Sequence, residues 1–250
     1  MKTSRNLRYV LAAILCLTLF AAATALAEED QGFVFRQTIT WESSMEDVLA
    51  SEADAETDLS APEFTILHTR MESNPPGERV YYFAKDEDCW QDPDAAPEFD
   101  GDRLVMIASL YDNGKDYKDY VDLSITLSFV FKNAYMHCRD PKEVIGLQTE
   151  APSSVNLLHC NEAASPAHPL GTDNMGRDVF SLLVAETDGP DDPVAQGRSK
   201  WAVEWEGWDL GDGTAVMLIW AAPQEDTGSG RMALFYVCPD GVKTAAGSGE

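Results

Sequence analysis

Apolar and polar residues alternate with a period of two over residues 121–131. Six apolar side chains, from Val121 to Phe131, are separated mainly by Asp, Ser and Thr. A period of two is typical of a strand with one buried face. We therefore predict a strand here, paired with a strand over 103–111 across the Asp-Asn-Gly-Lys turn at 112–115, because Asn-Gly tolerates the positive φ angles of a hairpin turn. A helix is the alternative.

Five further runs of aromatic and β-branched residues also predict strands. Turn signals rich in Pro, Gly and Asn separate several of them, such as Asn-Pro-Pro-Gly at 74–77 and Gly-Asp-Gly at 211–213. The five predicted strands span residues 64–70, 79–85, 200–206, 214–221 and 231–238.

Helical spacing occurs in two places. Ser43 and Glu46 have the spacing of a capping box, and Met45, Val48 and Leu49 follow at helical intervals, which predicts a helix over 44–55. A second helix is predicted to begin at Asp173 or Asn174 as N-cap and to stop at Gly189-Pro190. It carries three apolar residues on one face: Val179, Leu182 and Leu183.

These elements predict an α+β fold in which two helix-then-antiparallel-meander units carry their helices on one face of the sheet. The first unit spans 28–135 and the second spans 173–240. A Pro-, Ser- and Asn-rich connection at 136–172 joins them, and a small polar tail follows at 241–250.

The N-terminus has the layout of a signal peptide over 1–27. Lys2, Arg5 and Arg8 precede an apolar run, and the Ala-Leu-Ala at 25–27 is typical of a cleavage site. The apolar run is too short for a comfortable membrane span, although an uncleaved anchor is the alternative. We expect cleavage after Ala27 and a secreted chain with no membrane contact afterwards.

The chain is strongly acidic. It has 43 acidic and 18 basic residues and a net charge of -25, so phosphate backbones and anionic lipid surfaces would repel it. We therefore exclude nucleic acid as a partner. A hydrophobic content of 44% is too high for a disordered acidic tail and indicates a packed core.

Four cysteines follow the leader: Cys89, Cys138, Cys160 and Cys238. In an oxidising compartment they could form two disulfides, with three possible connectivities. We predict Cys138 with Cys160 and Cys89 with Cys238, and four free thiols are the alternative.

The order of elements resembles uncharacterised secreted proteins of Gram-positive bacteria. The likeness rests on a Trp-x-Ser-Ser-x-Glu-Asp-Val helix start at 41–48, a meander, a helix ending in Gly-Pro at 189–190, and Trp-rich strands ending in Tyr-x-Cys-Pro. The helix-plus-sheet repeat of those proteins is similar to the β-lactamase-inhibitor-protein and BamE-like folds. The resemblance implies a role in binding through a sheet face and assigns no functional residue.

Residues 168–179 resemble a segment near the start of peptide-transporter permease subunits. Those subunits cross the membrane several times, whereas this sequence has no candidate span after its leader. We interpret the likeness as a turn, an N-cap and a helix start.

Catalytic motifs are missing from the sequence. It has no Gly-x-Ser-x-Gly, no His-Glu-x-x-His and no Gly-rich phosphate loop. The His-Cys pairs at 137–138 and 159–160 do not suit zinc in extended strands, because adjacent side chains point to opposite faces. The Asp-rich loop at 86–94 lacks the glycine of a calcium loop and has Trp90 at a ligand position. We expect a protein that is not an enzyme and uses no metal or cofactor.

The remaining candidates for binding are aromatic. A sheet with helices on one face leaves the other face open, and exposed tryptophans are frequent binding hot spots. The candidate ligand-binding residues are Trp201, Trp205, Trp208 and Trp220. We expect a secreted, non-catalytic binding or inhibitory module that engages an extracellular protein or other ligand. The alternatives are a secreted hydrolase with a scattered carboxylate or His site and an acidic, calcium-responsive envelope protein.

Overall fold

The computed structural model describes residues 33–36, 38–52, 54–58, 64–72, 75–85, 102–112, 116–131, 134–137, 152–185 and 187–239. Eight strands form one sheet in the order β1-β2-β3-β4-β8-β7-β6-β5, and every neighbouring pair is antiparallel. The predicted α+β class is therefore confirmed. The strands are β1 (Glu56–Asp58), β2 (Phe64–Met71), β3 (Gly77–Ala84), β4 (Arg103–Tyr111), β5 (Tyr135–His137), β6 (Trp201–Asp209), β7 (Ala215–Pro223) and β8 (Arg231–Val237).

Helices α2 (Met45–Ser51) and α3 (Tyr117–Val130) both begin with a capping box. The box of α2 uses Ser44 and Asp47, one residue later than predicted, because the Ser43 hydroxyl instead accepts a hydrogen bond from the Thr40 amide at 2.9 Å. Three short helical segments occur later in the chain: α5 (Val179–Val184), α6 (Pro193–Arg198) and the 3-10 turn η3 (Thr227–Ser229).

The predicted strand over 121–131 is wrong, because this segment lies in α3. Asp116 caps the helix: its carboxylate accepts from the backbone amide of Asp119, and the Asp119 carboxylate accepts from the backbone amide of Asp116. Tyr120, Ser124 and Leu127, spaced four and three residues apart, are buried on one side of the helix. The chain therefore continues from β4 into a helix that packs on the sheet, and not into a hairpin partner.

The strand register defines two faces of the sheet. Directly paired residues share a face. One row across five strands contains Tyr81, Ile107, Tyr236, Val216 and Trp208, and we name its side the α3 face. The opposite row contains Val80, Ala108, Phe235, Met217 and Gly207, and we name its side the α5 face.

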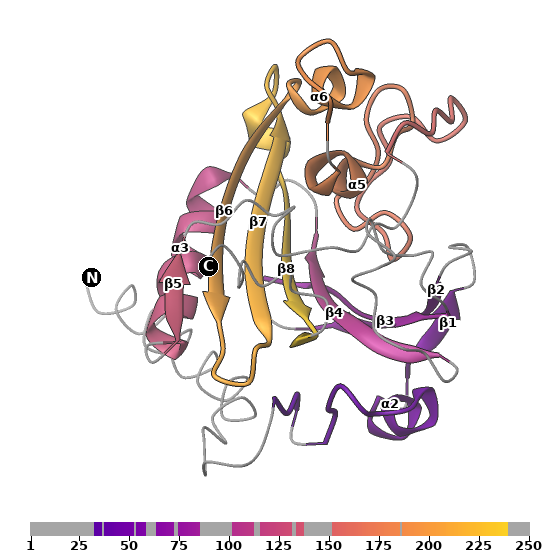
Figure 1. Ribbon diagram of the computed structural model, residues 1–250, viewed down its shortest axis with the longest axis vertical. Coiled ribbons are helices and arrows are strands. Elements are labelled where there is room, and N and C mark those ends of the chain that lie inside the picture. Colours follow the sequence, from indigo (N-terminus) through magenta and orange to yellow (C-terminus); the bar gives the residue numbers. More distant parts are fainter. Residues whose placement is uncertain are drawn as a thin grey trace, which may run out of the picture.

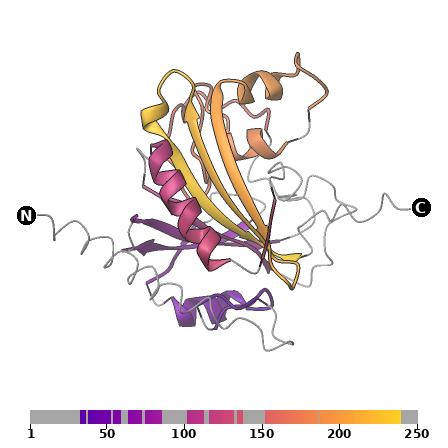
Figure 2. The same cartoon turned by 90° about the vertical axis from the view of Figure 1, so that its left-hand side faces the viewer.

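The helices do not all pack on one face, and that part of the prediction is wrong. Phe131, which follows α3, contacts Trp208 on one side of the sheet, whereas the ring centre of Phe180 in α5 lies 5.0 Å from that of Phe235 on the other side. Figure 1 shows α3 and α5 on either side of β6, β7 and β8, and Figure 2 shows the same arrangement from the side. The sheet therefore forms a middle layer.

The second predicted helix begins later than expected. Asp178, and not Asp173 or Asn174, is the N-cap of α5, and its carboxylate accepts from the Ser181 amide at 2.7 Å. Helix α6 was not predicted. Its Asp192-Pro193 start is an N-cap followed by a proline at the first helical position, a recognised sequence signal for a helix start.

Candidate functional site

The four candidate tryptophans do not form one surface. Trp201 and Trp205 lie on the α5 face, whereas Trp208 and Trp220 lie on the α3 face. Trp208 and Trp220 are 2% and 3% exposed and contact Phe131 and Tyr117 at the two ends of α3. Trp201 is also buried, and Trp205 alone is half-buried. Three of the four therefore belong to the core.

Residues 152–198, which we name the α5 layer, cover the side of β7 and β8 that the predicted fold leaves open. Arg231 of β8 anchors this layer by donating to the Leu170 carbonyl at 2.5 Å and to the Thr172 carbonyl at 3.1 Å. Its guanidinium also lies 4.9 Å from the centre of the Trp201 ring. Burial lowers the pKa of Arg231, although the charges of Asp178 and Asp173 oppose that shift. The anchored layer closes this part of the predicted binding face.

A second arginine holds the turn that precedes α5. The Asp173 carboxylate accepts from the Nε and Nη2 atoms of Arg177 at 2.8 and 2.7 Å, and also from the amides of Met175 and Arg177. Arg177 donates in turn to the carbonyl of Pro193, at the start of α6, at 2.9 Å. The 168–179 segment is thus a hydrogen-bonded turn followed by the Asp178 N-cap and the start of α5.

His168 and Asp178 form the pair in the α5 layer that most resembles catalytic machinery. Their Nδ1 and Oδ1 atoms are 3.4 Å apart, and Asp178 is fully buried. Burial and the charge of Asp178 also raise the pKa of Tyr82, whose hydroxyl donates to the Pro166 carbonyl. The other Asp178 oxygen caps α5, and the Ser165 hydroxyl accepts from the His168 amide. These contacts hold the fold of the layer.

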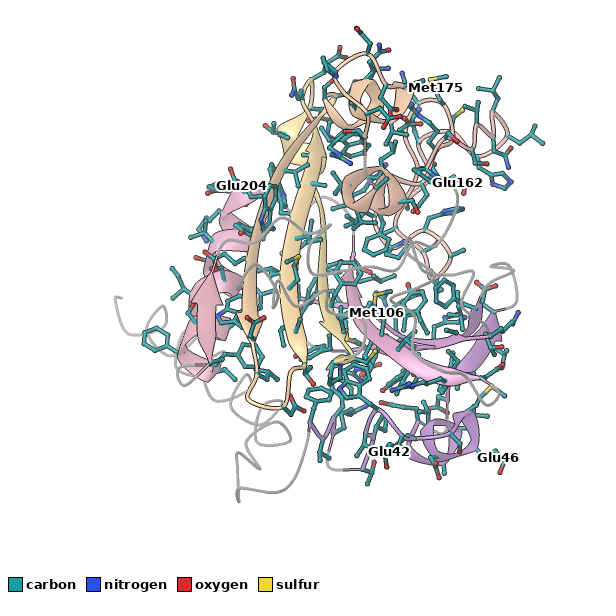
Figure 3. All side chains as sticks on the ribbon, in the orientation of Figure 1. Glu42, Glu46, Met106, Glu162, Met175 and Glu204 are labelled. Atoms are coloured by element: carbon teal, nitrogen blue, oxygen red, sulfur yellow. The ribbon has the colours of Figure 1, made fainter. Side chains whose placement is uncertain are left out.

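Four apolar side chains of the α5 layer are exposed, three of them within residues 155–158. Leu158 is 90% exposed and Leu157 is 70% exposed, with Val155 at 49% and Met175 at 37%. We name these four residues the apolar tip. Figure 3 labels Met175 in the α5 layer, far from Glu42 and Glu46 at the other end of the molecule. Exposed leucines on neighbouring positions of one loop are unusual, because most large apolar side chains are buried.

Hydrogen bonds fix the backbone that carries the apolar tip. The Asn156 amide donates to the Met175 carbonyl at 3.2 Å, and the Asn161 amide donates to the Asp173 carbonyl at 2.8 Å. The Thr172 hydroxyl accepts from the Glu162 amide at 2.9 Å and donates to the His159 carbonyl. This surface was not predicted, because residues 136–172 have the composition of a connection. The Val-Asn-Leu-Leu run at 155–158 is the sequence signal that could have indicated it.

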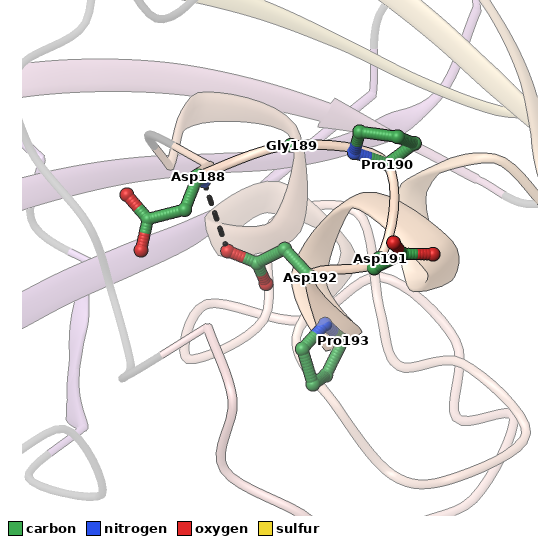
Figure 4. Close-up of a pocket in the computed structure, with 6 residues that line it drawn as sticks. All are labelled: Asp188, Gly189, Pro190, Asp191, Asp192 and Pro193. Carbon is green, nitrogen blue, oxygen red and sulfur yellow. Dashed lines mark hydrogen bonds between the residues drawn. The ribbon is translucent and has the colours of Figure 1, made fainter.

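A shallow hollow of about 360 Å³ lies among Asp188, Gly189, Pro190, Asp191, Asp192 and Pro193 (Figure 4). Asp192 uses its carboxylate to accept from the Val194 and Asp188 amides, and these bonds lower its pKa. Within the described part of the chain, no group of three or more His, Cys, Asp or Glu side chains could hold a metal ion. The Asp-rich loop at 86–94 lies outside the described residues.

The cysteine pairing stays a prediction. The Cys160 thiol donates to the Leu157 carbonyl at 3.4 Å, and Cys238, directly after β8, is buried. Their expected partners, Cys138 and Cys89, lie outside the described residues.

No family model, curated protein or solved structure matches this chain. Among the helices that the structure describes, none is long and apolar enough to cross a membrane.

Proposed function

We propose that this chain is an exported, non-catalytic binding or inhibitory module that engages an extracellular protein through the apolar tip. The observation that carries the proposal is the exposure of Leu157 and Leu158, at 70% and 90%, on a loop whose backbone is fixed by hydrogen bonds. Burying a leucine side chain against a partner is worth about 1.5–3 kcal/mol. The two leucines are therefore available as anchors.

Preorganisation of the loop supports binding. A loop that already has its bound conformation loses less conformational entropy when a partner associates. Asn161 adopts a positive φ of 56°, which costs free energy for a non-glycine residue and is maintained here by the surrounding hydrogen bonds. The polar residues Asn156, His159 and Glu162 flank the leucines in the sequence. An apolar centre with a polar rim is the usual composition of a protein interface.

The rest of the fold serves as a scaffold in this proposal. We infer that it consists of two helix-then-meander units, the first being α2 with β1 to β4 and the second being α3 with β5 to β8, a division that moves the start of the second unit from the predicted residue 173 to α3. Supporting this division, α2 and α3 begin with equivalent capping boxes and both contact the α3 face. The α5 layer is then an insertion between β5 and β6 that carries the binding surface on the opposite face.

Site-specific photo-crosslinking tests the proposed function. The photo-reactive residue p-benzoylphenylalanine replaces the exposed Ser153, two residues before Val155 in the sequence, in one version of the full chain. In a matched control it replaces the exposed Glu42, which Figure 3 labels at the other end of the molecule. Each version is irradiated with the exported proteins of the cells that produce it. We expect one discrete adduct from the Ser153 version, suppressed by excess unlabelled chain, and none from the control. Equal adducts at both positions, or no adduct at all, would contradict the proposal.

A further inference from the structure

We propose that the partner is a protein with an aliphatic pocket and a basic rim, and that Leu157 and Leu158 enter this pocket. The inference rests on the proposed function and specifies the chemistry of the partner. Leu158 is almost completely exposed and follows Leu157 directly, so the two side chains extend from one loop into solvent. A protruding pair of this kind is complementary to a concave site and not to a flat surface.

A lipid surface is the other apolar environment that such a tip could enter. Peripheral proteins that bind membranes combine apolar residues with Lys or Arg for anionic headgroups and with Trp or Tyr at the interface. Residues 143–176 contain no Lys, Arg, Trp or Tyr. With a net charge of -25 for the whole chain, electrostatics would oppose approach to an anionic membrane. These features favour a protein partner over lipid.

A second copy of the chain is also disfavoured. Each copy has a net charge of -25, so two copies repel each other at moderate ionic strength. Four aliphatic side chains cover far less than the roughly 800 Å² per partner of a standard stable interface. A pocket that surrounds the two leucines can add contacts that two convex tips cannot provide.

Charge complementarity specifies the rim of the pocket. Glu162 follows Leu158 by four residues, its carboxylate lies 2.7 Å from the Nδ1 atom of His159, and both side chains are about half exposed. Residues 152–176 contain no Lys or Arg to offset the acidic field of the chain. Lys or Arg side chains around the partner pocket would accelerate association and fix its orientation.

Thr172 is the positioning residue of this surface. Its buried hydroxyl bridges the Glu162 amide and the His159 carbonyl, and its own amide donates to the Glu162 carbonyl at 3.2 Å. Thr172→Val keeps the shape of the side chain but removes the hydroxyl that fixes the loop. We expect Thr172→Val to bind the partner more weakly than wild type, although the substitution does not change Leu157 or Leu158 themselves.

Competition against the Ser153 photo-crosslinking version tests the pocket even while the partner is unidentified. Unlabelled full-length variants are added, and the concentration that halves the adduct is measured. We expect Leu158→Met to compete within about threefold of wild type, because a pocket of this kind tolerates a similar volume. For Leu158→Asp, the concentration that halves the adduct should be about tenfold or more above that of wild type. Glu46→Gln, at the exposed start of α2, is the matched control and should compete like wild type.

Three further measurements separate the alternatives. Adduct yield should fall as salt is raised from low to high concentration, whereas an unchanged or rising yield would reject the basic rim. The chain should not sediment with phosphatidylcholine/phosphatidylglycerol vesicles, and sedimentation that Leu158→Asp abolishes would assign the tip to lipid. Dimers in analytical ultracentrifugation that the same variant dissociates would assign the tip to a second copy. Absence of any adduct rejects the binding module and the pocket together, whereas full competition by Leu158→Asp rejects the pocket alone.

Discussion

The carboxylate of Glu52 lies 2.7 Å from the hydroxyl of Tyr81, although Glu52 is the C-cap of α2 and Tyr81 is in the middle of β3. Arg36 and Arg79 donate to the same carboxylate oxygen at 2.5 and 3.4 Å, and Glu52 is only 8% exposed. A buried carboxylate needs such partners to offset its lost hydration. This contact attaches the first helix to the α3 face.

Glu52→Gln should destabilise the fold, because it removes the charge that satisfies Arg79 in a largely buried site. We expect a loss of about 2 kcal/mol in the free energy of unfolding, below the usual cost of breaking a fully buried pair, since Arg36 is 43% exposed and screened by water. Tyr81→Phe should cost about 1 kcal/mol, because it removes one hydrogen bond. Urea unfolding measures both, with exposed Glu42→Gln as control. An unchanged midpoint for Glu52→Gln would refute the role of this contact.

The same carboxylate should make stability depend on acid pH. Burial raises the pKa of Glu52, but the hydrogen bonds from Tyr81 and Arg36 and the charge of Arg79 outweigh burial, and its pKa lies below the ordinary value of 4.5. A lowered pKa in the folded state contributes stability that is complete above 4.5 and is lost as the pH falls through the folded pKa. The difference in unfolding free energy between wild type and Glu52→Gln should therefore shrink below pH 4.5. A difference independent of pH down to 2 would exclude this linkage.

Alanine substitutions should distinguish the tryptophans. Trp208→Ala and Trp220→Ala each remove a nearly fully buried ring against α3 and should cost about 3–5 kcal/mol. Trp205→Ala removes a half-buried ring and should cost clearly less. The thermal melting midpoints of the three variants give the order of their stabilities. A midpoint for Trp205→Ala as low as that for Trp208→Ala would place all of them in the core.

Six of the eight strands were predictable from sequence because they are apolar runs near turn signals, whereas the three-residue strands β1 and β5 were not predicted and β6 extends three residues past its predicted end. The structure has β4 at Arg103–Tyr111, within the predicted bounds, and β2, β3, β7 and β8 begin and end within two residues of prediction. Helix α3 was not predictable from its apolar pattern. Ile125 and Phe129 are exposed, at 53% and 77%, so the alternation does not mark the buried side. The buried side of the helix instead carries Tyr120 and the small Ser124. The Ser124 hydroxyl donates a hydrogen bond to the carboxylate of Glu206 in β6.

The candidate site was harder to predict, because long-range contacts create it. Nothing local shows that Arg231 binds the Leu170 and Thr172 carbonyls some sixty positions earlier in the chain. Without that contact, residues 152–172 have the composition of a loose connection. The tryptophans are candidates in the sequence because exposed aromatic residues often bind partners. The pairing of β6 with β7 places two of the four on each face of the sheet.

Alkaline pH should destabilise the fold through Tyr236, which lies in β8 among Phe33 and Phe35. Burial raises its pKa from 10.0 to about 12. A raised pKa in the folded state contributes stability that is complete below pH 10 and is lost as the pH rises toward 12, because the unfolded tyrosine ionises first. Tyr236→Phe should lose less stability than wild type between pH 10 and 12. Identical alkaline profiles for the two proteins would contradict this assignment.

Gly176 links the turn before α5 to the apolar tip, and its substitution should disturb the tip while sparing the core. Its φ is +71°, and a Cβ at this position would lie 1.8 Å from the carbonyl oxygen of Asn156. Gly176→Ala would therefore strain the backbone and push the 155–159 loop away from Met175. We expect faster hydrogen exchange at the Asn156 and Asn161 amides, with exchange in β7 and β8 unchanged. Gly211→Ala is the matched control, because no atom lies within 4 Å of a Cβ there. Loss of protection across β7 and β8 in Gly176→Ala would show that the α5 layer and the sheet unfold together, which would exclude a separately adjustable tip.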